Sequence, residues 1–125
     1  RSMAKISKRI TLLRGEIYVV HFDPTVGSEI KKTRPAIILQ NNIGNRHSNT
    51  TIVAAISSQF DEPLYPTEVF VGPSEGGFER PSVVLLSQVR TIDKSRLGKK
   101  IGVLGRETMG RVDQALEISL GLAGI

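Results

Sequence analysis

The chain has 125 residues, of which 39% are hydrophobic and 23% charged, as expected for one globular domain rather than a disordered or fibrous protein. It contains no cysteine, which excludes disulfides, thiolate metal sites and a cysteine nucleophile. Seventeen Lys and Arg oppose twelve Asp and Glu, but four of the basic residues lie within the first nine positions. The rest of the chain is therefore nearly neutral, and any anion-binding site must be local.

The first twelve residues are predicted to form a loose basic tail, in which Arg1-Ser2 before Met3 resembles a cloning remnant. Residues 13–125 are expected to form a single domain, because no repeat, low-complexity tract or Gly/Ser linker interrupts them. The sequence shows neither a secretory signal nor an apolar run of the ~20 residues that a membrane span needs. We therefore expect a cytoplasmic protein without a membrane partner.

The first half of the domain is predicted to contain three strands. Residues 16–22 are typical of a strand covered on both faces, and residues 35–40 of a second strand with proline at its first position. Residues 24–34 carry Pro, Gly and four charges, which predicts a long mobile loop. Residues 41–49 are rich in turn-forming residues, and the strongly apolar segment 50–57 predicts the third strand.

The second half is predicted to contain three further strands and a helix. The strands are expected at 67–71, 82–89 and 99–104, with a single helical turn around 94–97. From Arg106 to Leu122 apolar residues recur at helical spacing, which predicts a C-terminal helix that packs on the core. Five or six short strands and one helix indicate a mainly β fold, a small curled antiparallel sheet or barrel.

Few residues are typical of a metal or acid–base centre. His21 lies in an apolar strand and is expected to be buried and structural, whereas His47 lies in a polar turn. No His or carboxylate residues fall at a ligand spacing, so neither a metal site nor another cofactor is expected. The glycine-rich motifs of phosphate-binding and dinucleotide-binding loops do not occur.

The remaining chemical candidates lie at strand ends. Pro35 restricts Arg34 to an extended backbone, which holds its guanidinium where it can bind two phosphate oxygens. The alternative for Arg34 is an ordinary surface position, and for the polar residues 57–59 a simple strand-terminating turn. Gln88, within a continuous apolar strand, must hydrogen-bond either backbone groups or a nucleobase edge. Spacing alone does not decide among these alternatives.

Five segments carry a resemblance to a known family. They are RGEIYVVHFDPTVGSE at 14–29, KTRPAIILQNN at 32–42, TTIVAAISSQ at 50–59, ERPSVVLLSQVRTIDKSRL at 79–97 and VDQALEISLGL at 112–122. In this order they resemble the MazF/PemK family of toxin endoribonucleases from type II toxin–antitoxin systems. The resemblance implies an SH3-like barrel of five to seven strands with a C-terminal helix, assembled as a homodimer.

The resemblance also implies an activity. It is metal-independent, sequence-specific cleavage of single-stranded RNA to 2′,3′-cyclic phosphate and 5′-hydroxyl ends, which inhibits translation and growth until a cognate antitoxin neutralises the enzyme. The alternatives are a gyrase poison of the CcdB type, which shares this fold, and a non-catalytic RNA- or peptide-binding barrel. The action of the CcdB family looks tied to a tryptophan in its C-terminal helix, and this chain has no tryptophan.

Site residues are carried over by position. The family's catalytic arginine falls on Arg34 and its catalytic hydroxyl on Ser57, where related proteins usually carry threonine, with the adjacent Ser58 as the alternative. Glu29, on the loop 25–33 that would cover the active groove, is a candidate general base, and His47 is a second. The remaining RNA-binding candidates are Thr33, Asn41, Ser58, Gln59 and Gln88.

Overall fold

The computed structural model describes residues 11–125, so most of the predicted basic tail lies outside the described residues. Leu12, which the sequence places in that tail, is 3% exposed and belongs to the same hydrophobic cluster as Tyr18 and Phe22. The packed domain therefore includes Leu12, and the expected boundary at residue 13 is too late. Leucine is among the residue types most often fully buried, so Leu12 can join the core although basic residues precede it in the sequence.

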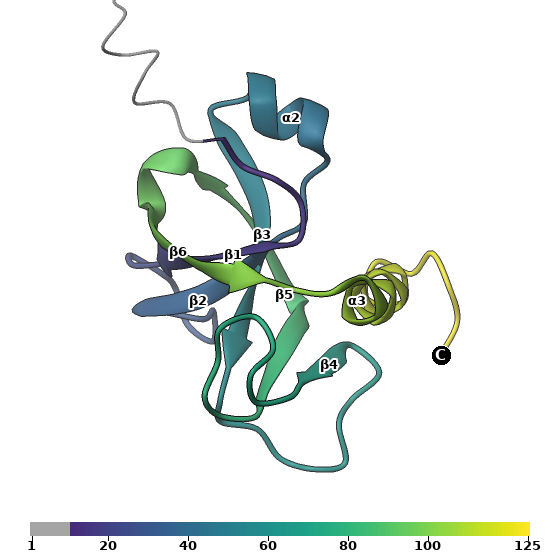
Figure 1. Cartoon of the computed structure of the whole chain (residues 1–125). Helices are drawn as coiled ribbons and strands as arrows, with labels where there is room; N and C mark the ends of the chain where they lie inside the picture. Colours follow the sequence, from purple (N-terminus) through teal and green to yellow (C-terminus); the bar gives the residue numbers. More distant parts are fainter. Residues whose placement is uncertain (1–10) are drawn as a thin grey trace, which may run out of the picture.

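Six antiparallel strands form one curled, barrel-like sheet in the order β4-β5-β3-β2-β1-β6 (Figure 1). The strands are β1 (Glu16–His21), β2 (Thr33–Ile38), β3 (Thr50–Ser57), β4 (Glu68–Val71), β5 (Ser82–Asp93) and β6 (Leu97–Val103). All six strands were predicted, and the mainly β fold with a C-terminal helix is confirmed. The largest difference is in β5, which continues to Asp93 beside β3 instead of ending at residue 89.

Strand β2 begins at Thr33 rather than at Pro35, so the proline is its third residue. Pro35 pairs with Val19 of β1, but pairing of β2 with β3 starts only at Ala36. The proline therefore precedes the part of the strand that is flanked on both sides, where a missing N–H would cost a ladder hydrogen bond.

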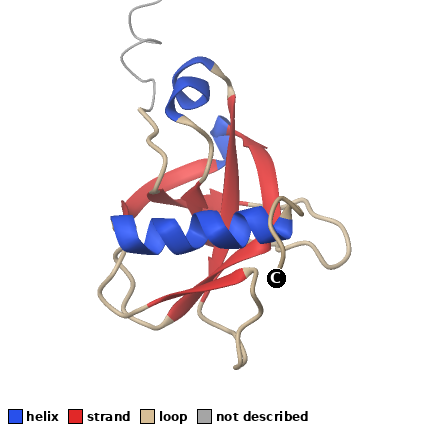
Figure 2. Ribbon diagram, turned by 90° about the vertical axis from the view of Figure 1, so that its right-hand side faces the viewer, coloured by secondary structure: helices blue, strands red, loops and turns tan. Residues whose placement is uncertain are grey.

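The helical elements are α2 (Asn42–His47), the 3₁₀ turn η1 (Lys94–Arg96) and α3 (Arg106–Ser119). Helix α3 lies across one face of the sheet, where Thr108, Val112 and Ala115 are buried (Figure 2). This confirms the predicted C-terminal helix, although it ends before Leu122. The short helix α2 was not predicted: the Asn41 side chain caps it by accepting a 2.8 Å hydrogen bond from the Gly44 N–H.

Hydrophobic clusters cover both faces of the sheet. Alternate strand residues such as Ile17, Ile37 and Ala54 share one cluster with Val112 of α3. The intervening residues, including Tyr18, Ala36 and Val53, belong to a second cluster on the other face. The near-continuous apolar sequence of β1 follows from this arrangement, because both of its faces are buried.

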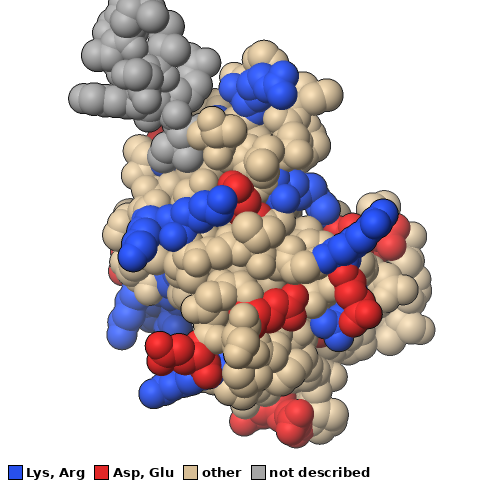
Figure 3. All heavy atoms as spheres, viewed as in Figure 1, with Lys and Arg blue, Asp and Glu red and all other residues tan. Residues whose placement is uncertain are grey.

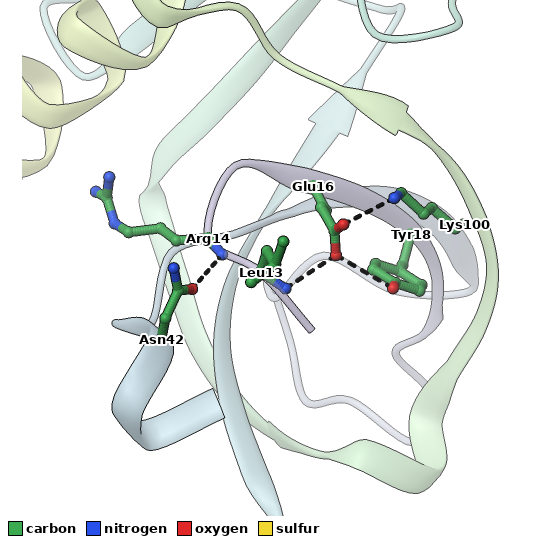
Figure 4. Close-up of polar contacts among 6 residues, drawn as sticks. All are labelled: Leu13, Arg14, Glu16, Tyr18, Asn42 and Lys100. Atoms are coloured by element: carbon green, nitrogen blue, oxygen red, sulfur yellow. Dashed lines mark hydrogen bonds and ion pairs between the residues drawn. The ribbon is translucent and has the colours of Figure 1, made fainter. Parts of the chain in front are cut away.

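A buried carboxylate ties three segments together beside the second cluster (Figure 4). Glu16, only 6% exposed, accepts hydrogen bonds from Lys100 Nζ on β6 at 2.7 Å, from the Leu13 N–H at 2.9 Å and from the Tyr18 hydroxyl at 3.3 Å. We call these four residues the Glu16 cluster. Burial acts to raise the pKa of Glu16, but the Lys100 and Leu13 hydrogen bonds and the Lys100 charge outweigh it and lower this pKa below its ordinary value. Burial, followed by the Glu16 charge, raises the pKa of Tyr18 to about 12.

Candidate active site

The start of β2, the end of β3 and the start of β5 meet at one end of the sheet, which we call the Arg34 end. Ala36 of β2 pairs with Ala55 of β3, and the same register continued by two residues places Arg34 opposite Ser57 on the same face. Ser57 pairs in turn with Val83 of β5. The sheet therefore places both residues for which the resemblance implies catalytic roles at the Arg34 end.

A cavity of about 390 Å³ opens at the Arg34 end. Of the residues expected in the site, Arg34 and Ser58 line it. The other lining residues are Pro35, Ile56, Gly77, Phe78, Glu79, Arg80, Ser82 and Ile101. The cavity thus combines apolar and aromatic groups with two guanidinium groups, of which that of Arg80 was missed in the sequence. A signal was present, because Arg80 precedes Pro81 just as Arg34 precedes Pro35.

Both guanidinium groups retain donors for a ligand. Arg34 Nε donates to the Lys31 carbonyl at 3.2 Å, while the side chain of Arg80 makes no hydrogen bond within residues 11–125. In the same residues, ion pairs join Arg14 to Asp113 and Lys100 to Glu16, but none involves Arg34 or Arg80. Each guanidinium carries five N–H donors, so the pair can bind several anionic oxygens.

Ser57 ends β3 in a local turn. Its hydroxyl donates to the Gln59 carbonyl and accepts from the Gln59 N–H, both at 3.1 Å, and the residue is 8% exposed. The strand-terminating turn considered for these residues is therefore present. Ser58 is exposed and lines the cavity, whereas Ser57 does not, and Gln59 lines a separate hollow with Phe60.

The loop between β1 and β2 is anchored over the second cluster. Gln88 Oε1 accepts a 2.6 Å hydrogen bond from the Ile30 N–H, so the backbone alternative predicted for this glutamine is the one observed. Ile30 packs against the second cluster. The Glu29 carboxylate accepts from the Val26 N–H at 2.7 Å, within the loop itself, and does not line the cavity.

Other expected residues lie apart from the cavity. Asn41 caps α2, which follows the end of β2 opposite to Arg34 (Figure 1). His47, the last residue of α2, belongs to that same distant end. Thr33 Oγ1 hydrogen-bonds His21 Nδ1 at 2.9 Å, and both residues are exposed. The prediction that His21 is buried was wrong, because β1 ends there and its last side chain points outward.

The sequence predicts a domain that is nearly neutral beyond its first nine residues. Figure 3 shows acidic and basic side chains interspersed over one face of the molecule, without a continuous basic stripe on that face. Within residues 11–125, no three His, Asp or Glu side chains form a group that could hold a metal ion. None of the helices in the described part of the chain is long and apolar enough to cross a membrane.

Known proteins match nearly the whole domain. Residues 13–120 match the family model described as a PemK-like, MazF-like toxin of a type II toxin–antitoxin system. Endoribonuclease EndoA of Bacillus subtilis (strain 168) is 51% identical over 109 residues, which cover 87% of this chain and 94% of the relative.

Solved structures share the fold. The Mycobacterium tuberculosis toxin MazF-mt6 has a TM-score of 0.73 at 27% identity, with 87% of this chain and 99% of that chain covered. An endoribonuclease in complex with its cognate antitoxin, from a mycobacterial species, has a TM-score of 0.75 at 26% identity, with 91% and 99% covered.

Proposed function

This chain belongs to the PemK-like, MazF-like toxin family of type II toxin–antitoxin systems, and from that membership we propose that it is an endoribonuclease toxin acting at the Arg34 end of its sheet. The observation that supports this location is that Arg34 borders a cavity of about 390 Å³ and has no carboxylate partner within residues 11–125. Ser57 ends the neighbouring strand, two residues beyond the last β2–β3 pair, Ala36 with Ala55. A fixed, unpaired guanidinium beside a hydroxyl suits an RNA phosphate.

The proposed reaction is attack of a ribose 2′-oxygen on the adjacent phosphorus. The 2′-O–P bond forms as the P–O5′ bond breaks, the 2′-hydroxyl gives its proton to a base, and the leaving 5′-oxygen receives one. The products are a 2′,3′-cyclic phosphate and a 5′-hydroxyl. Arg34 stabilises the negative charge that develops on the phosphoryl oxygens, since a guanidinium with a pKa above about 12 is a poor proton carrier near neutral pH.

Ser57 supplies a second hydrogen bond to a non-bridging oxygen. The hydrogen bond from the Gln59 N–H holds the Ser57 oxygen in place, while its proton can turn from the Gln59 carbonyl to the phosphate. In threonine, the methyl group restricts χ1. In this chain, the hydrogen bond from the Gln59 N–H restricts the Ser57 side chain instead. The serine therefore remains suited to the role implied by the resemblance.

Glu29 is the proposed general base, and it requires a different loop conformation. Its carboxylate must leave the Val26 N–H, and Gln88 Oε1 must release the Ile30 N–H before that oxygen can accept a hydrogen bond from RNA. Ser58, which is exposed and lines the cavity, is proposed to contact the RNA, as are Thr33 at the start of β2 and Gln59, which lines the separate hollow with Phe60. Asn41 lies too far along the sheet to share the same nucleotide.

We further propose that the chain acts as a homodimer in the cytoplasm and is neutralised by a cognate antitoxin. The family resemblance supports the dimer. A mycobacterial endoribonuclease of the same fold has been solved with its cognate antitoxin, which supports the second partner. Cytoplasmic RNA is the substrate that such a toxin needs in order to stop translation.

The test is cleavage of a long RNA in the presence of EDTA. The wild-type protein is expected to yield discrete fragments that end in 2′,3′-cyclic phosphates, and Arg34→Ala to lower kcat by at least about 10²-fold. His21→Ala and His47→Ala serve as controls with unchanged rates. Full activity of a folded Arg34→Ala variant would refute the site, and RNA left intact by the wild type would favour a non-catalytic barrel.

A further inference from the structure

One wall of the cavity is shaped by backbone packing of glycines against β6. A Cβ at Gly77, where φ is +87°, would lie 2.8 Å from the Ile101 carbonyl oxygen. A Cβ at Gly102 would lie 2.5 Å from the Gly76 carbonyl oxygen. Contacts this short allow no side chain at either position. The turn that carries Phe78 is therefore fixed against Ile101, and both side chains line the cavity.

The backbone of Arg80 is also held in place. Ser82, which is 3% exposed, donates its hydroxyl to the Arg80 carbonyl at 3.1 Å. Pro81 restricts Arg80 to an extended conformation, as Pro35 restricts Arg34. Two arginines thus enter one cavity from the starts of two strands, each from a restrained backbone.

We propose that this cavity is a nucleotide subsite, in which Arg80 binds a phosphate next to the scissile one and the base lies against Phe78 and Ile101. The inference rests on the proposed function and extends it to residues that the family match does not assign. The cavity volume of about 390 Å³ lies in the range of small-ligand sites. An aromatic side chain beside a cationic groove is the usual arrangement for single-stranded nucleic acid.

Glu79 favours a nucleotide over an acidic peptide. Glu79 lines the same cavity, and the negative charge of its carboxylate would repel the many carboxylates of an acidic peptide. The same carboxylate can accept a hydrogen bond from the exocyclic amino group of a base. The cavity thus offers a cation for a phosphate, an apolar surface for a ring and an acceptor for an amino group.

The role proposed for Arg80 differs from that of Arg34, because Arg80 contacts a phosphate that does not react. A contact to a phosphate that does not react is made equally in the ground state and the transition state, so its loss raises KM and leaves kcat unchanged. Each phosphate contact to a single strand adds about 0.7 to the slope of log affinity against log salt concentration.

The experiment uses an RNA that spans a mapped cleavage site and carries a 2′-deoxy nucleotide there, so that it binds without being cut. Its Kd is measured against KCl concentration for the wild type, Arg80→Ala and Arg46→Ala. The exposed Arg46 of α2, at the opposite end of the sheet, is the matched control. Arg80→Ala is expected to weaken binding by about 10-fold or more and to lower the salt slope by about 0.7, with Arg46→Ala unchanged.

Two further variants test the apolar side of the subsite. Phe78→Ala is expected to weaken binding by about 5-fold or more without changing the salt slope, because stacking on an aromatic ring involves no counterion release. Phe78→Leu keeps apolar volume but lacks the ring, and should also weaken binding. Thermal unfolding of both variants reports whether the turn has stayed folded.

Two results would overturn the subsite. They are wild-type affinity and salt slope in Arg80→Ala, or, when Arg80→Ala cleaves the unmodified RNA, a fall in kcat instead of a rise in KM. In each case wild-type cleavage of RNA in EDTA would continue, so failure of the subsite is distinguishable from failure of the proposed function.

Discussion

The Glu16 cluster and the Arg34 end both place basic side chains beside strands, yet the partners of these cations differ. Lys100 meets a buried carboxylate that also accepts from a backbone N–H and a tyrosine hydroxyl. Arg34 and Arg80 share one cavity, and neither has a carboxylate partner within residues 11–125. Glu79 also lines this cavity but pairs with neither arginine in the described residues, so a bound anion would relieve the repulsion between the two like charges. The partner, more than the residue type, separates a structural cation from a ligand-binding one.

The largest expected effect concerns the two serines at the Arg34 end. Ser57→Ala removes the proposed hydrogen bond to the phosphoryl oxygen and should lower kcat by about 10²–10³-fold, or about 2.7–4 kcal/mol of barrier. Ser58→Ala should act mainly on KM, and Ser57→Thr should retain activity. Single-turnover cleavage of a short RNA measures all three variants. If Ser58→Ala lost kcat while Ser57→Ala kept it, the catalytic hydroxyl would belong to Ser58.

A smaller effect, on stability, is expected at the Glu16 cluster, where Lys100 already has Glu16 as its partner. Glu16→Gln removes the charge but keeps the shape, and weakens the hydrogen bonds from Lys100 and Leu13. The free energy of unfolding should fall by about 1–3 kcal/mol, measured by urea denaturation, with kcat unchanged.

The matched control is the more exposed ion pair between Arg14 and Asp113. Asp113→Asn should cost less than about 1 kcal/mol of unfolding free energy. Equal losses in Glu16→Gln and Asp113→Asn would mean that burial adds nothing to the Glu16 contacts.

The smallest effect is the pH dependence of that same cluster. Because the pKa of Glu16 is lowered in the folded protein, its contribution to stability is present above its ordinary value of 4.5 and is lost as the pH falls through the folded value. The difference in unfolding free energy between wild type and Glu16→Gln should therefore narrow on acidification below pH 4.5. Urea denaturation at several pH values measures it, and a constant difference would argue against a lowered pKa.

Much of the fold follows from local patterns. Strand β3 was predicted to the residue, because a strongly apolar core segment is bounded by threonines and serines. Helix α2 was missed because Asn41, Gly44 and their neighbours are typical of turns, and the same asparagine also caps a helix. His21 could not be placed correctly, since its exposure depends on where β1 ends rather than on its apolar neighbours.

The site was less predictable than the fold. The Arg-Pro pair before an apolar segment made Arg34 a candidate, but spacing alone left an ordinary surface position open, and the choice of Arg34 came from the family resemblance. The second such pair, Arg80-Pro81, follows an acidic stretch, and only the fold shows that it shares the cavity of Arg34. The contact between Gln88 and Ile30 joins residues 58 positions apart, a separation that no local pattern encodes.

The glycine contacts also bear on how the RNA preference of the proposed subsite can change. Gly77 and Gly102 admit no side chain, so a substitution at either glycine would force the backbone of the turn to move. The backbone shape of that wall is therefore fixed. Variation must instead act through the side chains on the wall, those of Phe78, Glu79 and Ile101. A laboratory library aimed at new cleavage sequences should randomise these three positions and keep both glycines.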